Sequence, residues 1–422
     1  MVQPPYGQYQ APPYQAPPYQ APPYQPPQAP RGGGMQPPQG PGMAPPKGSP
    51  LRFVGAGIWV LGVLVGLLLL GYFFALPPEV KGRYVIPPDK YYTGMLIGAL
   101  IAFPACFVYL WVPVIVDRYD PEPWWLLAMS FLWGAIPACA FSALFNDINS
   151  AIGGAIAGKA GADIAGAVIS APLVEEAFKG MLVLGVFLFA RHQFDGVVDG
   201  VIYATFVALG FAATENVLYY SRAWYKGGGE ALCCTVSLRG LIAPWGHPLY
   251  TAMTGLGVGW ARESNSMAVK IFAPIGGYFA AAFLHSCWNG SAVFSDLLGV
   301  PLFPIALLFF LLFLVAFGVI VILLVRREGK IIRHNLQDEL LLGNITKEEL
   351  ELVCSPFGRM KALMGAGGSS GRKFVDAASR LALSKWHTSR AMQGRKQTIS
   401  ADFIVPMRQE MARLRQEIQG RR

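Results

Sequence analysis

The sequence predicts an all-α, polytopic membrane protein of about eight transmembrane helices, with a disordered N-terminal tail and a soluble helical C-terminal tail. Hydrophobic residues make up 53% of the 422 residues, and charged residues only 14%. Apolar runs of about 20 residues, enough to cross roughly 30 Å of hydrocarbon, recur along the chain. We expect spans at about 53–76, 93–116, 123–145, 171–190, 197–220, 240–261, 268–294 and 302–325.

The N-terminal tail is residues 1–50, where "APPYQ" occurs three times between positions 11 and 25. Sequence rich in Pro, Tyr and Gln cannot bury a core and favours disorder or polyproline II. We expect a solvated cytoplasmic tail; a ligand for proline-binding partners is the alternative. The first apolar run follows this polar stretch, so we interpret it as a signal anchor rather than a cleaved signal peptide.

Residues 51–326 form the predicted membrane domain, and residues 327–422 form a basic cytoplasmic tail. From Arg326 to Arg422 there are 19 Lys and Arg against 10 Asp and Glu, a balance of +9 that equals the net charge of the whole chain. Basic residues directly after the last span favour a cytoplasmic C-terminus. With eight spans the N-terminus is then cytoplasmic as well.

The basic tail also contains helix signals, among them the capping box "TKEE" at 346–349. Its charge suits anionic lipid headgroups, so membrane lipids are the partner we expect. No nucleic-acid-binding module is recognisable, and we expect no nucleic acid partner. Cytoplasmic proteins that bind either tail are a further expectation.

Between the third and fourth spans, the Gly- and Ala-rich residues 151–170 predict a loosely packed hairpin or a re-entrant segment. The six cysteines have no disulfide, zinc or CxxC spacing. We therefore expect no redox chemistry.

Four consecutive spans contain ionisable or amide side chains, which are costly at membrane depth and usually have a partner and a function. The fourth contains Glu175, Glu176 and Lys179; the fifth Glu215 and Asn216; the sixth Arg239 and His247; the seventh His285 and Asn289.

These residues lie at similar depths in the predicted topology. Glu175 is about five residues from the outer end of its span, Glu215 about six, His247 about eight and His285 about nine, which agree within one turn at roughly 1.5 Å per residue. Lys179 can pair with either glutamate of its own helix. Any one residue alone has an ordinary explanation, such as an interfacial anchor or a packed histidine. Together they predict one site, with a core of motifs at 171–291.

Two chemistries use two histidines with carboxylates. In the first, His247, His285 and a glutamate bind zinc with an open position for water, and another glutamate is the base. In the second, no metal is present: Glu175 activates water, one histidine orients it, and Asn289 with the other histidine stabilises the oxyanion. The spacing does not choose between them or between the two glutamates.

Three other interpretations stay open. An ion- or proton-coupled transporter also places Glu, Lys and His in broken helices, although near the midplane and between internal repeats that we do not find. A non-catalytic membrane scaffold would present its two tails to partners. An aspartyl protease using Asp195 and Asp199 is the weakest, because these residues lie four apart on one span.

The motifs "EEAFK", "GFAATEN", "HPLYTAMTG" and "HSCWN" resemble, in the same order, those of the PrsW family of intramembrane proteases. That family is similar to the type II CAAX prenyl endopeptidase superfamily. The resemblance covers about residues 95–295 and includes "DRYDPEP" and "FDGVVDGVIY". It implies a membrane-embedded peptidase that cleaves single-span membrane proteins, such as anti-sigma factors, near the outer face of the cell membrane.

The resemblance also implies roles for individual residues. Glu175 and Glu176 would be the catalytic pair, and Asn289 would help the oxyanion. His247 and His285 would be metal ligands or transition-state stabilisers. Glu215 stands where the CAAX relatives more often have a histidine, and Lys179 where they have an arginine. Asn216 and Arg239 would support the site.

Overall fold

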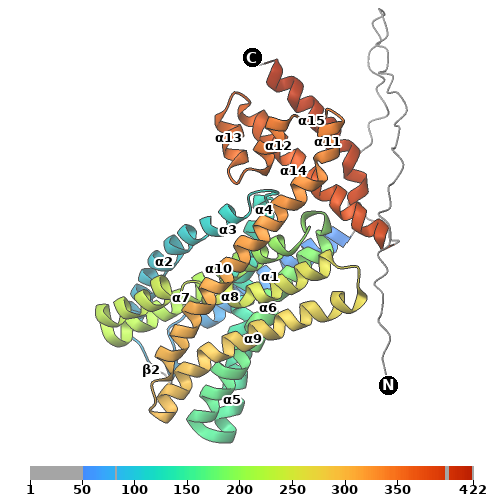
Figure 1. Cartoon of the computed structure of the whole chain (residues 1–422). Helices are drawn as coiled ribbons and strands as arrows, with labels where there is room; N and C mark the ends of the chain where they lie inside the picture. The colour runs from blue at the N-terminus through green and yellow to red at the C-terminus, as the bar shows by residue number, and fades with distance from the viewer. Residues whose placement is uncertain (1–50, 81–82, 395–398, 421–422) are drawn as a thin grey trace, which may run out of the picture. The chain divides into compact units, whose positions relative to one another are not determined.

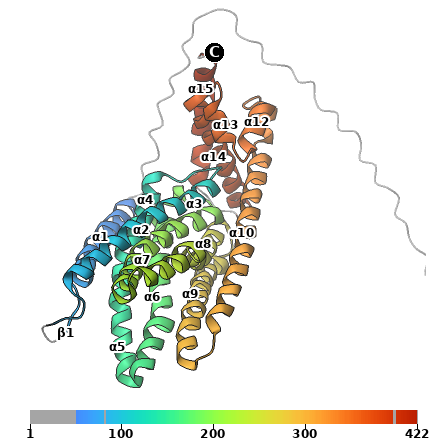
Figure 2. The same ribbon diagram turned by 90° about the vertical axis from the view of Figure 1, so that its left-hand side faces the viewer.

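The computed structural model describes residues 51–80, 83–394 and 399–420. The predicted N-terminal tail, residues 1–50, lies outside this part, as do residues 81–82, 395–398 and 421–422. The described residues form one compact helical unit (Figures 1 and 2). The division at residue 326 between membrane domain and tail stays a prediction.

The first half of the chain contains two long helices, a two-residue β-hairpin and a run of helices interrupted by π-helical turns. The elements are α1 (Leu51–Phe74), β1 (Glu79–Val80), β2 (Arg83–Tyr84), α2 (Pro88–Tyr109), α3 (Trp111–Val116), α4 (Trp124–Trp133), η1 (Gly134–Ala138), α5 (Cys139–Asp163), η2 (Ile164–Ser170), α6 (Ala171–Phe189) and η3 (Arg191–Gln193).

The second half contains the longest helices and the helices of the tail. They are α7 (Val197–Val236), η4 (Ser237–Ile242), α8 (Gly246–Glu263), α9 (Met267–Leu298), α10 (Leu302–Asn335), α11 (Gln337–Leu341), α12 (Lys347–Cys354), α13 (Gly358–Met364), α14 (Gly368–Gln393), η5 (Ile399–Phe403) and α15 (Ile404–Gln419).

Six helical segments of the described chain are long and apolar enough to cross a membrane, and two of them, Trp124–Phe189 and Val197–Glu263, fold back on themselves. The bends lie at Gly158, with φ 62° and ψ −150°, and at Gly228, with φ 63° and ψ −152°. Glycine adopts this backbone conformation without the clash that a Cβ would cause. Eight helical passes result among the described residues, in agreement with the predicted number.

The predicted hairpin at 151–170 is the first of these bends. Its two limbs lie so close that a Cβ on Gly153 would come 2.3 Å from the carbonyl oxygen of Gly161. The third pass is longer than predicted, because the helix continues past residue 145 to the bend. The sixth begins before residue 240, directly after Gly228.

Large apolar side chains face outward along several helices. Leu68 of α1 is 76% exposed, and Phe309 and Val315 of α10 are 67% and 68% exposed. A continuous apolar surface of this kind needs lipid around it rather than water. Together with the spans, it identifies a multi-pass membrane protein.

Helix α7 is the centre of the bundle, and its residues from Val197 to Ala213 are buried or nearly so. Small residues let its neighbours approach closely. A Cβ on Gly200 of α7 would meet the carbonyl oxygen of Gly255 of α8 at 2.2 Å, and the converse distance is also 2.2 Å. Such small-residue contacts bring helix backbones together in membranes. They bring α8 close enough for its side chains to reach those of α7.

Helix α10 continues from the bundle into the tail helices α11 to α15 (Figures 1 and 2). These helices have their own apolar core, which includes Ile332, Leu336, Leu381 and Leu414. The tail contacts the polar connections of the membrane helices. Arg380 Nε donates to Asp120 Oδ1 at 2.7 Å, and Asn265 Nδ2 donates to the carbonyl oxygen of Arg390 at 2.9 Å.

Candidate active site

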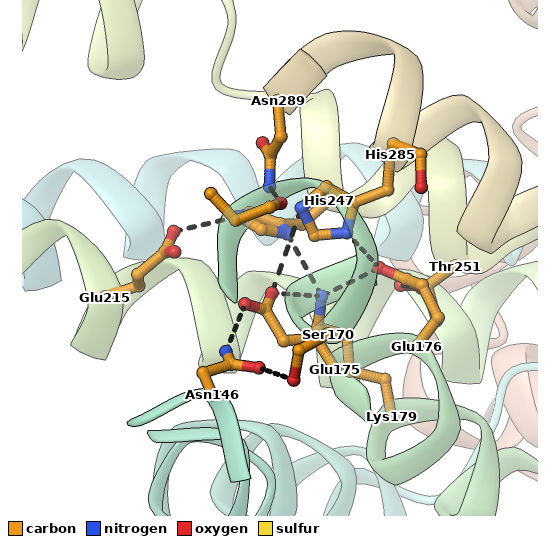
Figure 3. Close-up of polar contacts among 12 residues, drawn as sticks. Asn146, Ser170, Glu175, Glu176, Lys179, Glu215, His247, Thr251, His285 and Asn289 are labelled. Carbon is orange, nitrogen blue, oxygen red and sulfur yellow. Dashed lines mark hydrogen bonds and ion pairs between the residues drawn. The ribbon is translucent and has the colours of Figure 1, made fainter. Parts of the chain in front are cut away.

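The polar side chains predicted from four spans meet in the interior of the bundle. Figure 3 shows the three glutamates, Lys179 and the two histidines pointing toward one another from α6, α7, α8 and α9. The name polar cluster is used below for the six ionisable residues at the centre: Glu175, Glu176, Lys179, Glu215, His247 and His285. Four separate helices contribute to it, as the depth argument predicted.

Lys179 occupies the middle of the polar cluster and is completely buried. Its Nζ lies 2.8 Å from Glu176 Oε1, 3.4 Å from Glu175 Oε2 and 3.0 Å from His247 Nδ1. The ring of Phe211 lies beneath the ammonium, with its centroid 4.0 Å from Nζ. A buried cation needs such compensation for its lost hydration. The i,i+3 and i,i+4 positions on α6 supply both carboxylates.

The two adjacent glutamates have different environments. Glu176 is 0% exposed; Oε2 accepts a hydrogen bond from Thr251 Oγ1 at 2.7 Å, and Oε1 lies 3.2 Å from His285 Nδ1. Glu175 lies at the edge of a cavity and accepts two long hydrogen bonds, from Asn146 Nδ2 to Oε1 and from Lys179 Nζ to Oε2, both at 3.4 Å. Its Oε2 is 3.9 Å from His285 Nε2, too far for a direct hydrogen bond. Glu175 is therefore the carboxylate with capacity left for another molecule.

A second ionic group adjoins the first on the α7 side. Glu215 Oε2 lies 2.9 Å from His247 Nε2 and also accepts a short hydrogen bond from Arg239 Nη2. Arg239 Nε donates to Asn216 Oδ1 at 2.7 Å. His247 thus lies between Lys179 and Glu215, with one ring nitrogen facing each. The geometry fixes the orientation of the imidazole from both sides.

Asn289 lies one turn from His285 on α9 and donates through Nδ2 to the carbonyl oxygen of Ala167 at 2.9 Å. An amide nitrogen has two hydrogens, so a second one is available to another acceptor. Asn289 lines both cavities that reach the cluster. It lies beside the cluster rather than within it.

Four residues near the cluster were not predicted. Asn146 connects Glu175 to Ser170, whose Oγ donates to Asn146 Oδ1 at 2.8 Å. Thr251 is four residues after His247, so helical spacing alone places it on the same face of α8. Tyr250 stacks on His285 with ring centroids 5.1 Å apart. Asn146 was missed because the third span was predicted to end at residue 145.

A polar cleft of about 440 Å³ opens onto the cluster. Its lining includes Asn146, Asp147, Glu175, Glu215, Arg222 and Asn289, from α5, α6, α7 and α9. A smaller cavity of about 40 Å³ lies on the other side of the histidines, next to Tyr250 and Trp288. Solvent and a polar chain therefore have a route to Glu175.

The donor atoms suit a zinc ion in number and kind. One ligand atom each from Glu175, His247 and His285 lies within 4.8 Å of the other two, and two imidazoles with one carboxylate form a typical catalytic zinc set. In this conformation, however, both nitrogens of His247 have partners, Lys179 and Glu215. A metal would have to replace one of those contacts.

Asp195 and Asp199 are outside the cluster and have another use. Asp199 Oδ2 accepts hydrogen bonds from the backbone amides of Asp195 and Gly196, at 3.1 Å in the case of Gly196. These bonds satisfy amides at the start of α7. The Asp199 carboxylate thus caps the helix, whereas the Asp195 carboxylate faces Arg262 and His387, so the two do not share a substrate position as an aspartyl protease requires.

Known proteins with similar sequences include two curated proteases. Protease PrsW of Geobacillus kaustophilus is 32% identical over 146 residues, which are 35% of this chain and 58% of that protein. Protease PrsW of Oceanobacillus iheyensis is 33% identical over 149 residues, 35% of this chain and 62% of that protein. The chain thus spans about 60% of the length of these relatives. No solved structure matches it.

The family model described as "PrsW family intramembrane metalloprotease" matches residues 122–322. This range includes all six residues of the polar cluster and the helices that hold them, and it excludes the whole predicted C-terminal tail, residues 327–422. Residues 122–322 of this chain therefore match the PrsW family of intramembrane metalloproteases.

Proposed function

We propose that this chain is an endopeptidase of the cell membrane that cleaves single-span membrane proteins beside their transmembrane segment. The observation that supports the proposal most strongly is the position of Glu175. It is a buried carboxylate with spare hydrogen-bonding capacity, at the point where the polar cleft meets two histidines. A general base needs both a route for water and a geometry held by its neighbours.

In the proposed reaction, Glu175 removes a proton from a water molecule that enters through the polar cleft. The water oxygen attacks the carbonyl carbon of the scissile peptide, and the tetrahedral oxyanion accepts hydrogen bonds from the second Nδ2 hydrogen of Asn289 and from a histidine. Glu175 then gives the proton to the leaving amine as the C–N bond breaks. Glu176 and Thr251 hold Lys179 and His285 in position from behind.

In the zinc alternative, Glu175, His247 and His285 would hold the ion, which when bound would polarise the water and the scissile carbonyl, and another glutamate would have to be the base. Glu215, Asn216 and Arg239 would orient His247.

We propose that both termini lie on the cytoplasmic side, as the basic tail favours, and that the tails bind lipid headgroups or cytoplasmic partners.

The experiment compares protein N-termini in membranes of cells with the wild-type chain and with Glu175→Gln, at matched protein levels. We expect new termini next to the transmembrane segments of a few single-span proteins, present only with the wild type. Identical termini alongside an ion-flux difference in reconstituted vesicles would support a transporter instead. Identical termini with binding of partners to the tails intact would support a scaffold.

A further inference from the structure

An apolar groove lies on the lipid-facing side of the polar cluster, between α8, α9 and α10. It has a volume of about 480 Å³ and is lined almost entirely by carbon, with Leu284, Cys287 and Trp288 on one wall and Ile305, Phe309 and Phe313 on the other. This volume is within the range of pockets that enclose ligands, roughly 300–1,000 Å³. The groove is not part of the catalytic arrangement described above.

The groove is continuous with the site. Tyr250 and Trp288 line both the groove and the small cavity that contains Glu215, His247, His285 and Asn289. Each of these two side chains thus borders the apolar groove and the cavity that contains the ionic groups. A chain lying in the groove would therefore be separated from the cavity of the histidines by no more than the residues that line both.

The polar cleft approaches the same groups from another side. Glu215 and Asn289 line both the cleft and the small cavity. Apolar groove, small cavity and polar cleft thus share lining residues in sequence, and Glu175 lines the cleft beside the histidines. A polypeptide that followed this route would have apolar residues on one side of the site and polar residues on the other.

Tyr250 indicates which kind of molecule fits the groove. Its hydroxyl is buried and has no hydrogen-bond partner among the described residues, although a buried hydroxyl normally has one. The methylene and methyl groups of a lipid chain, which would fill an apolar groove, cannot hydrogen-bond to it. A peptide backbone has both a carbonyl oxygen and an amide hydrogen at every residue.

From these observations we infer that the groove between α8, α9 and α10 binds the membrane-proximal apolar residues next to the scissile bond of the substrate, and that the Tyr250 hydroxyl bonds to the substrate backbone. The inference rests on the proposed peptidase function and specifies its substrates. They are polypeptides cut at the junction between an apolar segment and a polar one.

The first test fills the groove in the full-length chain. Ala306 lines the groove, whereas Ala316, ten residues later on the same helix, is exposed and lies outside it. We expect Ala306→Trp to reduce the Glu175-dependent new termini at least tenfold, and Ala316→Trp to change them less than twofold, at equal protein levels and thermal stability. Equal activity of the two variants would overturn the inference while leaving the peptidase function intact.

The second test identifies the occupant directly. A photo-crosslinking amino acid replaces Phe309, which is 67% exposed in the groove, or Val315, which is 68% exposed on another face of α10. In a Glu175→Gln background, we expect the position 309 probe to capture the same polypeptides that wild type cleaves. Capture of phospholipid alone, or of a second copy of this chain, would overturn the inference. If no new N-termini depend on Glu175, both the proposed peptidase function and this inference are wrong.

Discussion

Nζ of Lys179 lies 3.0 Å from Nδ1 of His247, on the opposite side of the imidazole from the nitrogen that faces Glu215. The ammonium thus occupies a position among the three residues whose donor atoms suit zinc. A lysine and a divalent cation would repel each other at this distance, so the two compete for the same carboxylates and the same ring.

The first prediction follows from that competition. We expect Lys179→Met to raise the zinc affinity of the purified protein at least tenfold, because a repelling charge is gone, even though two buried carboxylates lose their partner. The zinc content of the purified protein after equilibration with a metal buffer measures this affinity. Arg239→Met is the matched control, since Arg239 contacts Glu215 rather than the three candidate ligands. Equal zinc affinity of both variants and wild type would show that lysine and metal do not share a site.

The second prediction separates the two adjacent glutamates. Glu175→Gln should lower peptidase activity by roughly 10²–10⁴-fold with little loss of stability, as expected for removal of a general base. Glu176→Gln should instead destabilise the fold by about 3–5 kcal/mol, because Lys179 remains buried without its nearest partner. Cleavage rate and thermal unfolding in detergent distinguish the two effects. A stable, inactive Glu176→Gln protein would contradict this division of roles.

The third prediction concerns Thr251, which donates to Glu176 across two helices. Thr251→Ala should cost about 1–3 kcal/mol in unfolding free energy, since Glu176 loses a buried hydrogen bond. Thr205→Ala is the control: Thr205 Oγ1 bonds only to the Val201 carbonyl of its own helix. We expect Thr205→Ala to lower the unfolding free energy by less than Thr251→Ala does. Similar losses of unfolding free energy in the two variants would mean that the hydrogen bond from Thr251 to Glu176 stabilises the fold no more than a bond within one helix does.

The sequence was sufficient for the number of helical passes and for the residues of the polar cluster, because both follow from hydropathy and from charges placed at helical depth. It did not reveal Asn146, Tyr250 or the groove. Apolar residues on a lipid-facing helix have the same composition whether they line a groove or a flat surface. Only the packing of α8, α9 and α10 against one another distinguishes the two.

The fourth prediction concerns the contact between the tail and the membrane helices. His387 of α14 lies 3.4 Å from Asp195 Oδ1. Burial, followed by the nearby cations Arg262 and Arg390, lowers its pKa to about 3. In the docked tail the His387 imidazole therefore stays neutral, whereas in a released tail it binds a proton below about pH 6.5. Docking should weaken as the pH falls below that value, by up to about tenfold per pH unit.

Hydrogen exchange of α14 in the full chain, corrected for the intrinsic rate, measures this docking. His387→Gln should remove the pH dependence between about 6.5 and 5. The control is His334→Gln, because His334 is exposed on the tail end of α10. If wild type and His387→Gln respond to pH alike, another group controls the contact.

The arrangement around Lys179 also determines what the site attracts. Glu175, Glu176 and Glu215 contribute three negative charges and Lys179 one positive charge, and the adjoining Arg239 adds a second positive charge. With neutral imidazoles, the polar cluster together with Arg239 therefore has a net charge of −1. One bound proton makes it neutral, while a divalent cation added to a protonated cluster expels that proton. Protons and metal ions thus compete for the same site. A fall in pH would lower the amount of metal that the site binds, and a rise in metal concentration would lower the number of protons that it binds.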